Sequence, residues 1–245
     1  MNRLLRVTLF LVVLAFAGGA ALIAALCIGH RVSVTLPAPR GPFAVSRAIE
    51  VWSDARRADP LFPERRTELV VWMWYPCAPS SHRKPAEYVP ADWRRHMGRG
   101  IFGTLLWRDP AVVHAHSAAD APLSPAQSRY PVVILRGGLG AASTQYTTLA
   151  EEMASHGDVV IAFDAPYRSG MVVFPDGRVV YRPQSLNPET MPAESAERLA
   201  AKLLAAWVSD IAFVVDRLPS SRFSGPCRSR SGDLSLVRRA LSQLS

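Results

Sequence analysis

The stretch YPVVILRGGLGAASTQY, residues Tyr130–Tyr146, constrains this chain more than any other. It opens with the aliphatic run Val132–Leu135, which is typical of a strand buried on both faces of a parallel sheet. Three glycines follow within four positions, Gly137–Gly140, and a helical pattern then runs from about Thr144 to Ser155. Strand, glycine turn and helix in this order predict backbone N–H groups at the carboxyl end of a central strand.

Such a glycine turn has two interpretations. Glycine reaches φ > 0 and lets the backbone approach a ligand closely, so the turn can hold a phosphate or supply a donor to an oxyanion hole. The same pattern is also typical of a tight strand-to-helix connection that binds nothing. A nucleotide site is not indicated, because the glycines do not follow G-x-G-x-x-G and no Lys-Ser/Thr pair comes after them.

Further elements predict an α/β fold. The segment Glu68–Tyr75 is dense in strand formers, and its two tryptophans fit a sheet face better than a substrate site. A second buried strand is expected at Val159–Phe163. The segment Glu194–Leu218 predicts a long helix whose apolar stripe faces the sheet, with Asp210 and Asp216 on its wetter side. Together these elements predict a mostly parallel sheet with helices on both faces.

Two features near the end of the second strand bear on function. Asp164 lies at the carboxyl end of that strand, the functional edge of a parallel sheet. It either binds substrate or, more often for such a residue, fixes the loop Pro166–Arg168 by hydrogen bonds. The segments Met171–Phe174 and Arg178–Tyr181 flank a Pro-Asp-Gly turn and predict a β-hairpin.

The N-terminus predicts a membrane segment. No charged residue occurs from Val7 to Gly29, a run long enough for a helix that crosses a bilayer. Arg3 and Arg6 precede the run and favour a cytoplasmic N-terminus, with the rest of the chain on the extracytoplasmic side. The alternative is a cleaved signal peptide, which would leave a secreted or periplasmic protein.

Composition limits the partners. The net charge is +8, but much of the excess is arginine near the two ends and no nucleic-acid motif is present, so no nucleic-acid partner is expected. His114 and His116 would share one face of a strand, as a metal site needs, yet their neighbours resemble a loop and no third ligand is near, so no metal is predicted. No cofactor is expected. His156 fits the last turn of a helix, where it favours the helix dipole.

The residues around the glycine turn resemble a known family. YPVVILRGGLGA and the following LAEEMASHGDVVIAFDAPYRSG (Leu149–Gly170) are similar to platelet-activating factor acetylhydrolases and their dienelactone-hydrolase-like relatives, which are α/β-hydrolases. Further similarity lies at VWMWYP (Val71–Pro76), at FPDGRVV (Phe174–Val180) and across Gly41–Pro60. The resemblance extends from about Val34 to Arg222.

This resemblance implies hydrolysis of carboxylic esters, with a small-molecule ester or a short-acyl phospholipid as substrate. It implies serine acylation with a histidine base and with backbone N–H groups that hold the oxyanion. The donor implied here is the N–H of Leu139, with Gly138 and Gly140 shaping the turn. The family's His-Gly is replaced by Gly137-Gly138 in this chain. The resemblance also places the predicted hairpin near the active site.

The catalytic residues themselves do not carry over. In α/β-hydrolases the triad comes in the order Ser, acid, His, and the serine lies in a G-x-S-x-G turn. The elbow should follow the helix Glu194–Leu218, but this chain contains no G-x-S-x-G, and its last histidine is His156. After Arg222 the sequence interleaves Arg and Ser and shows no buried strand run, so we assign no catalytic residue.

The sequence therefore predicts three segments: a membrane anchor or signal segment (1–33), a partial α/β-hydrolase domain (34–222) and a divergent basic tail (223–245). The sheet should be mostly parallel and incomplete in its C-terminal half, as in a truncated or frameshifted hydrolase. The alternative is a membrane-anchored remnant without catalysis.

Overall fold

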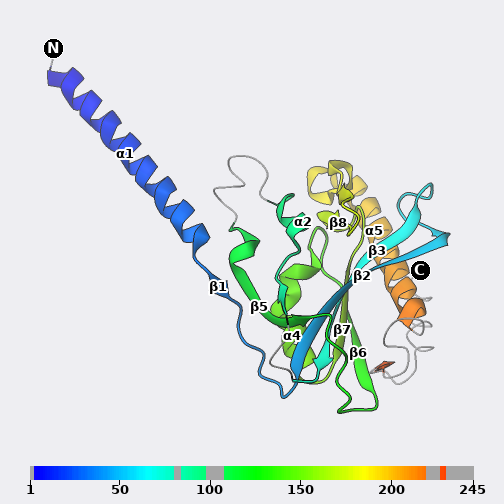
Figure 1. The fold of residues 1–245 in the computed structure, drawn as a ribbon. Coiled ribbons are helices and arrows are strands. Elements are labelled where there is room, and N and C mark those ends of the chain that lie inside the picture. The colour runs from blue at the N-terminus through cyan, green and yellow to red at the C-terminus, as the bar shows by residue number, and fades with distance from the viewer. Residues whose placement is uncertain (1–2, 80–83, 98–107, 219–226, 230–245) are drawn as a thin grey trace. The chain divides into compact units, whose positions relative to one another are not determined.

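The computed structural model describes residues 3–79, 84–97, 108–218 and 227–229. The chain forms two compact units, one of residues 1–36 with 87–114 and the other of residues 37–86 with 115–245. The smaller unit begins with an apolar helix, and the larger unit holds the sheet and the glycine turn (Figure 1).

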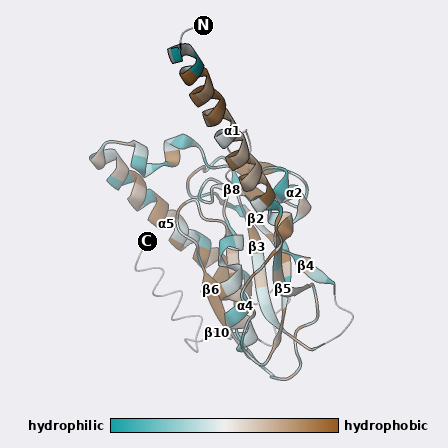
Figure 2. Cartoon of the chain, turned by 90° about the vertical axis from the view of Figure 1, so that its left-hand side faces the viewer, coloured by the Kyte–Doolittle hydropathy of each residue, from teal (hydrophilic) through white to brown (hydrophobic). Residues whose placement is uncertain are grey.

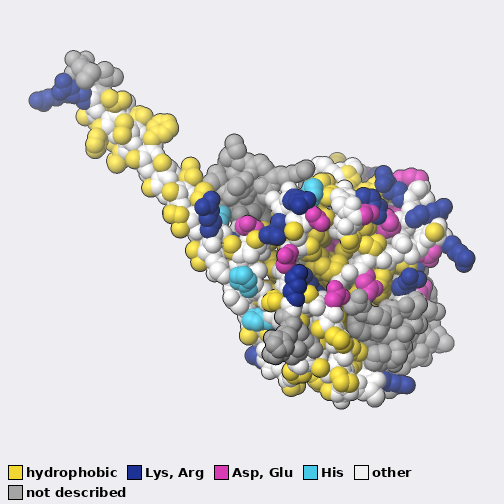
Figure 3. Space-filling view, viewed as in Figure 1, with side chains coloured by type: hydrophobic (Ala, Val, Ile, Leu, Met, Phe, Trp, Pro, Cys, Tyr) yellow, Lys and Arg dark blue, Asp and Glu magenta, His cyan; other side chains and the backbone are white. Residues whose placement is uncertain are grey.

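Helix α1 (Arg3–Arg31) contains the whole uncharged run that the sequence predicts as a membrane segment. Its apolar side chains are exposed, including Phe10 at 66% and Phe16 at 78%. Figures 2 and 3 show hydrophobic residues along the helix on the sides in view. By length and composition the segment Arg6–Arg31 can cross a membrane, and a signal sequence near an N-terminus would share both properties.

The other elements of the smaller unit are short. They are β1 (Val34–Thr35), α2 (Ala91–Arg94) and the 3₁₀ helix η1 (Pro110–Val112). The carboxylate of Asp109 caps η1 by accepting from the N–H of Ala111 at 2.8 Å. Strand β1 pairs in parallel with the first residues of β5 (Val113–Ala119), where Val34 lies opposite Val113.

A mixed sheet forms the larger unit. Its further strands are β2 (Ala44–Ala58), β3 (Arg66–Cys77), β4 (Pro85–Glu87), β6 (Tyr130–Leu135), β7 (Val159–Asp164) and β10 (Cys227–Ser229). The order is β5-β2-β3-β7-β6-β10, and β4 pairs with β5. Strand β3 is antiparallel to both of its neighbours, β2 and β7, whereas β2 pairs in parallel with β5, and β6 pairs in parallel with both β7 and β10. The two strands predicted around the glycine turn are therefore parallel neighbours.

The core follows from the alternation of side chains along β3. Leu69, Val71, Met73 and Tyr75 point to one face, where they pack with Phe213, Val214 and Leu218 at the end of helix α5 (Ala193–Arg217). On the other face Trp72 and Trp74 are fully buried, with their rings stacked at 6.1 Å. Helix α4 (Thr147–Ser155) contacts β3 and β7, and Figure 1 shows α4 and α5 on opposite sides of the sheet. The fold is of the predicted α/β type.

The predicted hairpin is also present. Strands β8 (Met171–Val173) and β9 (Val179–Tyr181) pair in antiparallel register. Gly177 closes the turn between them with φ +85°, a conformation that glycine adopts without strain. Two short 3₁₀ helices, η3 (Gln184–Leu186) and η4 (Pro188–Thr190), then connect the hairpin to α5.

Strand β10 is a difference from the sequence analysis, which expected no strand run after Arg222. Cys227–Ser229 pairs in parallel with β6, with Cys227 opposite Tyr130. Strand pairing needs only backbone N–H and C=O groups, and an unpaired edge of β6 would leave several of these without partners. Three residues without an apolar pattern therefore suffice, and a search for hydrophobic strands misses them.

Candidate functional site

The glycine turn follows β6 directly and leads through the 3₁₀ helix η2 (Ser143–Tyr146) into α4. Gly140 adopts φ +81°, a left-handed conformation that favours glycine. Gly137 has no room for a side chain, since a Cβ there would lie 2.9 Å from the ring of Tyr146. Gly138 is exposed and has open space around it. The turn is therefore tightly packed at its start and open at its middle.

Two backbone hydrogen bonds fix the turn to the loop after β7. The N–H of Gly140 donates to the carbonyl of Arg168 at 3.0 Å, and the N–H of Gly170 donates to the carbonyl of Gly140 at 3.1 Å. A Cβ at Gly170 would lie 2.8 Å from that carbonyl oxygen, so the approach requires glycine. The N–H of Leu139 has no hydrogen-bond partner within the described part of the chain. The turn is thus held in place while one of its donors stays unused.

Asp164, at the end of β7, connects the turn to the sheet. It accepts hydrogen bonds from the N–H of Ser143 at 2.8 Å, from the hydroxyl of Ser143 at 3.0 Å and from Nε1 of Trp72 at 2.8 Å. Burial raises the pKa of Asp164 to about 6, against the opposing effect of these hydrogen bonds. The predicted hydrogen bonds to the loop Pro166–Arg168 are not found among the described residues, and Ser169, just after that loop, makes one long contact at 3.5 Å. Because Asp164 is fully buried, the geometry supports a structural role.

Arg136 directly follows β6, and its side chain lies on the face that α5 covers. Its guanidinium lies between two rings, 5.4 Å from the centroid of Phe163 and 5.3 Å from that of Trp207. Its Nη1 donates to the carbonyl of Gly137 at 2.7 Å, which fixes the first peptide of the turn. Burial lowers the pKa of Arg136, while the nearby carboxylates Asp210 and Asp164 raise it by a smaller amount. Arg136 therefore connects the start of the turn to the face of the sheet that α5 covers.

A buried ion cluster holds the loop after β7 against α5. The guanidinium of Arg168 is fully buried, with Nη2 3.0 Å from a carboxylate oxygen of Asp59 and Nε 2.7 Å from one of Asp210. Burial alone would lower the pKa of Arg168, but the attraction of Asp210 and Asp59 outweighs it and raises the pKa. The expectation that Asp210 lies on the wetter side of its helix is wrong, because Arg168 gives this carboxylate a buried partner. Asp216 is exposed as expected.

The hairpin reaches the glycine turn through Arg182, the residue after β9. Its N–H donates to the carbonyl of Gly170 at 3.1 Å. Its guanidinium lies over Gly140, where a Cβ would be 3.5 Å from Nη2. At the tip of the hairpin, Arg178 pairs with Glu68 of β3 at 2.9 Å. The hairpin is therefore fixed both to the sheet and to the turn.

The candidate histidines lie elsewhere. His156 follows α4, where it is exposed and pairs with Glu152 at 3.2 Å. His114 and His116 lie in β5 and not in a loop, and His114 pairs with Thr35 of β1. The backbone N–H of His116 and that of Ser117 both donate to the buried carboxylate of Glu151. Within the described residues, no group of three or more His, Cys, Asp or Glu side chains is placed to hold a metal ion.

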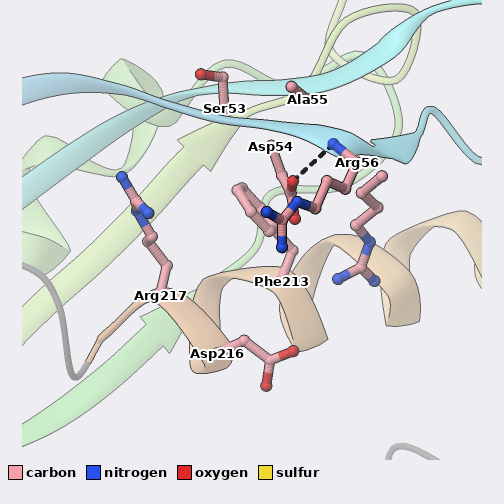
Figure 4. A pocket seen from close by; sticks show the side chains of 8 residues that line it. Ser53, Asp54, Ala55, Arg56, Phe213, Asp216 and Arg217 are labelled. Atoms are coloured by element: carbon pink, nitrogen blue, oxygen red, sulfur yellow. Dashed lines mark hydrogen bonds between the residues drawn. The ribbon is translucent and has the colours of Figure 1, made fainter.

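A cleft of about 340 Å³ lies between the end of β2 and the last turns of α5 (Figure 4). Its lining residues are Ser53, Asp54, Ala55, Arg56, Arg57, Phe213, Asp216 and Arg217. Arg57 is held by the carbonyl and the hydroxyl of Ser209, at 2.7 and 2.8 Å. The lining contains one serine, no histidine and no residue of the glycine turn, so this cleft does not extend the site at β6.

Sequence reasoning identified the turn but missed the arginines around it. Arg136, Arg168 and Arg182 each make contacts that bring together segments far apart in the chain. Isolated arginines carry no periodic signal, so only the position of Arg136 directly before the glycines could have marked it. Gly138, Leu139 and Gly140, the residues predicted to form an oxyanion site, occupy the turn itself.

Comparison with known proteins gives a family for this arrangement. A sequence profile of the family described as platelet-activating factor acetylhydrolase, isoform II, matches residues 29–175, more than half of the chain. The chain belongs to this family. The matched part of this acetylhydrolase-family chain includes the glycine turn, Asp164 and the loop that holds the turn.

A solved structure agrees with the family. Ferulic acid esterase from Streptomyces cinnamoneus is 26% identical in sequence, with a TM-score of 0.61. The similarity covers 84% of this acetylhydrolase-family chain but only 58% of the esterase chain, so this chain spans somewhat more than half of that enzyme. Comparison with curated proteins finds no match. Family and neighbour together relate the chain to α/β-hydrolases that act on esters.

Proposed function

We propose that this chain carries the oxyanion-binding half of an ester hydrolase site and does not cleave esters by itself. The observation that carries the proposal is the N–H of Leu139, which lacks a partner among the described residues and lies on a turn fixed by two backbone hydrogen bonds. Catalytic oxyanion sites use donors that are held in place before the reaction, because such donors need no reorganisation when charge develops. Gly138 and Gly140 give the turn its open middle and its left-handed bend.

The motifs of the sequence support the second part of this proposal. Ester cleavage in α/β-hydrolases needs a serine nucleophile in a strained turn, with a histidine that takes its proton. The chain has no G-x-S-x-G, and no histidine follows His156. By family, the substrate of a complete protein would be a small-molecule ester or a short-acyl lipid. The other candidate is a membrane-anchored remnant without catalysis. The absence of a G-x-S-x-G elbow supports this candidate equally well.

Two assays on the full chain in detergent micelles test the proposal. We expect no hydrolysis of p-nitrophenyl acetate above background, because loss of a serine nucleophile or its base costs on the order of 10⁶ in turnover. We also expect no labelling by a fluorophosphonate probe, with a complete serine esterase as the positive control. Stoichiometric labelling of one serine would overturn the proposal and identify a nucleophile.

We further propose that the basic tail after Phe223 arose by a frameshift near the codon for Gly225. The resemblance that we read in the residues extends to about Arg222, beyond the 29–175 that the family profile matches, and the residues that follow are rich in Arg, Ser and Leu, as an out-of-frame reading of a GC-rich gene would be. Another frame of the same DNA should then encode a Val/Ile/Phe strand, a G-x-S-x-G elbow and later an Asp and a His. Absence of an elbow from all three frames would leave the remnant as the correct interpretation.

For localisation we propose an uncleaved anchor with the larger unit on the extracytoplasmic side. The length of α1 and the arginines before its apolar run support this orientation. After expression with a C-terminal tag, the full-length chain should stay in the membrane pellet through a carbonate wash. A soluble form shortened by the length of α1 would show instead that the segment is a signal peptide.

A further inference from the structure

Arg182 differs from the other arginine of the hairpin in what surrounds it. Arg178 is saturated, with hydrogen bonds from its guanidinium to Glu68 and to Asp176. The guanidinium of Arg182 makes one long hydrogen bond, from Nη1 to the carbonyl of Leu186 at 3.4 Å. Its Nε and Nη2 have no hydrogen-bond partner among the described residues, and no carboxylate there pairs with it. One edge of this cation is therefore unused.

That unused edge lies beside the glycine turn. The atoms nearest to a Cβ built on Gly140 all belong to Arg182: Nη2 at 3.5 Å, Cζ at 3.7 Å and Nε at 4.0 Å. The backbone of Arg182 is fixed there by its bond to Gly170, which in turn bonds to Gly140. A half-buried guanidinium thus lies over Gly140. The N–H of the preceding residue, Leu139, is also without a hydrogen-bond partner among the described residues.

Donors on and beside one turn that lack protein acceptors are groups that an anionic ligand can use. The Nε and Nη2 atoms form the edge of a guanidinium that binds carboxylate and phosphate groups with two parallel hydrogen bonds. The N–H of Gly138, which makes only a 3.4 Å contact with the hydroxyl of Tyr146, adds another weakly used donor on the exposed side of the turn. Arg178 cannot compete for such a ligand because Glu68 and Asp176 already occupy it.

We propose that Arg182 is the charged member of a small-oxyanion site on the glycine turn, which takes a phosphate, phosphonate or carboxylate group. The inference rests on the proposed function of the turn and adds a side chain to its backbone donors. Arg182 supplies positive charge to the anion, and the N–H of Leu139 supplies a hydrogen bond. This binding needs no nucleophile, so the chain should show it without any turnover.

The sequence offers a single-residue probe of this site. Gly138-Leu139 is the only Gly-Leu pair in the chain, so labelling with ¹³C-carbonyl glycine and ¹⁵N-leucine selects one amide, that of Leu139. The full chain in detergent micelles is titrated with methylphosphonate at fixed ionic strength. We expect this amide peak to shift in a saturable way.

Three variants separate the charge from the turn. Arg182→Gln should weaken methylphosphonate binding about tenfold or more, which is the effect of losing a charge-assisted hydrogen-bond pair. Arg182→Lys keeps the charge without the planar guanidinium, so its affinity for methylphosphonate should lie between those of the wild type and Arg182→Gln. Arg178→Gln removes the same charge from the same hairpin and should leave the affinity unchanged. Thermal unfolding of the Arg182 variants should match that of the wild type, which excludes a purely structural effect.

The outcomes distinguish the two proposals. If the Leu139 peak shifts but Arg182→Gln binds as tightly as the wild type, or if Arg178→Gln weakens binding equally, the role of Arg182 is wrong and the turn remains a site. If the peak does not shift in the wild type, the oxyanion function of the turn fails as well. Ester turnover by the wild type would contradict only the claim that the chain lacks catalysis.

Discussion

Asp210 of α5 lies 2.7 Å from Nε of Arg168, although 42 residues separate them, and both side chains are fully buried. Asp59, directly after β2, accepts from the same guanidinium at 3.0 and 3.1 Å. The cluster joins three segments: the end of β2, the loop that holds the glycine turn, and α5. One buried cation thus positions the helix and the candidate site together.

Removing this cation should therefore destabilise the fold strongly. Arg168→Met leaves two buried carboxylates without their partner, and breaking a buried ion pair on one side costs about 3–5 kcal/mol. Arg178→Met removes a guanidinium that also pairs with two carboxylates but is exposed, so it should cost less than about 1 kcal/mol. The free energy of unfolding from urea titration in micelles measures both. Equal losses would mean that burial does not set the cost.

A second buried carboxylate joins α4 to β5. One oxygen of Glu151 accepts from the N–H of His116 at 2.9 Å, from the N–H of Ser117 at 2.7 Å and from its hydroxyl at 2.5 Å. Glu151→Ala should cost roughly 3 kcal/mol or more, because three donors lose their acceptor.

Glu151→Gln should cost only about 1 kcal/mol, because the amide oxygen can accept the same three hydrogen bonds. The neighbouring Glu152 provides the control, because it is only partly buried and pairs with the more exposed Arg40 and His156, so Glu152→Gln should change stability little. If Glu151→Gln were as damaging as Glu151→Ala, the negative charge itself and not the acceptor would be what β5 needs.

Asp164 predicts a dependence of stability on pH. Its pKa is raised in the folded protein to about 6, so the folded state binds the proton more tightly than the unfolded chain does. The stabilisation is complete below the unfolded pKa of about 4 and is lost as pH rises through 6. The free energy of unfolding of the wild type, relative to that of Asp164→Asn, should fall by roughly 2–3 kcal/mol between pH 4 and pH 7.

The exposed Asp176 gives a matched control, since Arg178 holds its pKa below the ordinary value. Asp176→Asn should therefore show no such change above pH 5. Urea titrations of both variants at half-unit pH intervals measure the difference. A wild-type curve parallel to that of Asp164→Asn would show that folding does not raise the pKa of Asp164.

How much the sequence predicted depends on the kind of signal. The aliphatic runs of β6 and β7, the pattern of α5 and the Pro-Asp-Gly hairpin are local, and each appears in the structure where it was expected. Asp210 was misplaced because a helical pattern records polarity and not the partner that makes a buried charge tolerable. Strand β10 was missed because its pairing depends on the backbone of β6.

The same distinction between local and long-range signals applies to the candidate site. Glycines report local backbone needs, so the turn was visible in the sequence. Its arginines act across long separations, and nothing in the residues around Arg182 indicates that it will lie over Gly140. The two adjacent glutamates of α4 show the same limit, since Glu151 is buried and Glu152 is not for reasons that lie in β5.

The two glycines beside Leu139 should respond differently to the same substitution. Gly140 has φ +81°, so Gly140→Ala places a Cβ in a strained conformation and should cost about 1–2 kcal/mol of unfolding free energy. Gly138 has no positive φ and open space around it, so Gly138→Ala should stay within about 0.5 kcal/mol of the wild type. Urea titration measures the stability of both variants. The position of the Leu139 amide peak reports the conformation of the turn. In Gly140→Ala this peak is selected by the Gly-Leu labelling, and in Gly138→Ala, which lacks the Gly-Leu pair, it is assigned by triple-resonance spectra. If Gly140→Ala left both the stability and the amide position unchanged, the turn would not be held by its left-handed bend, and a fixed oxyanion donor at Leu139 would lose its structural basis.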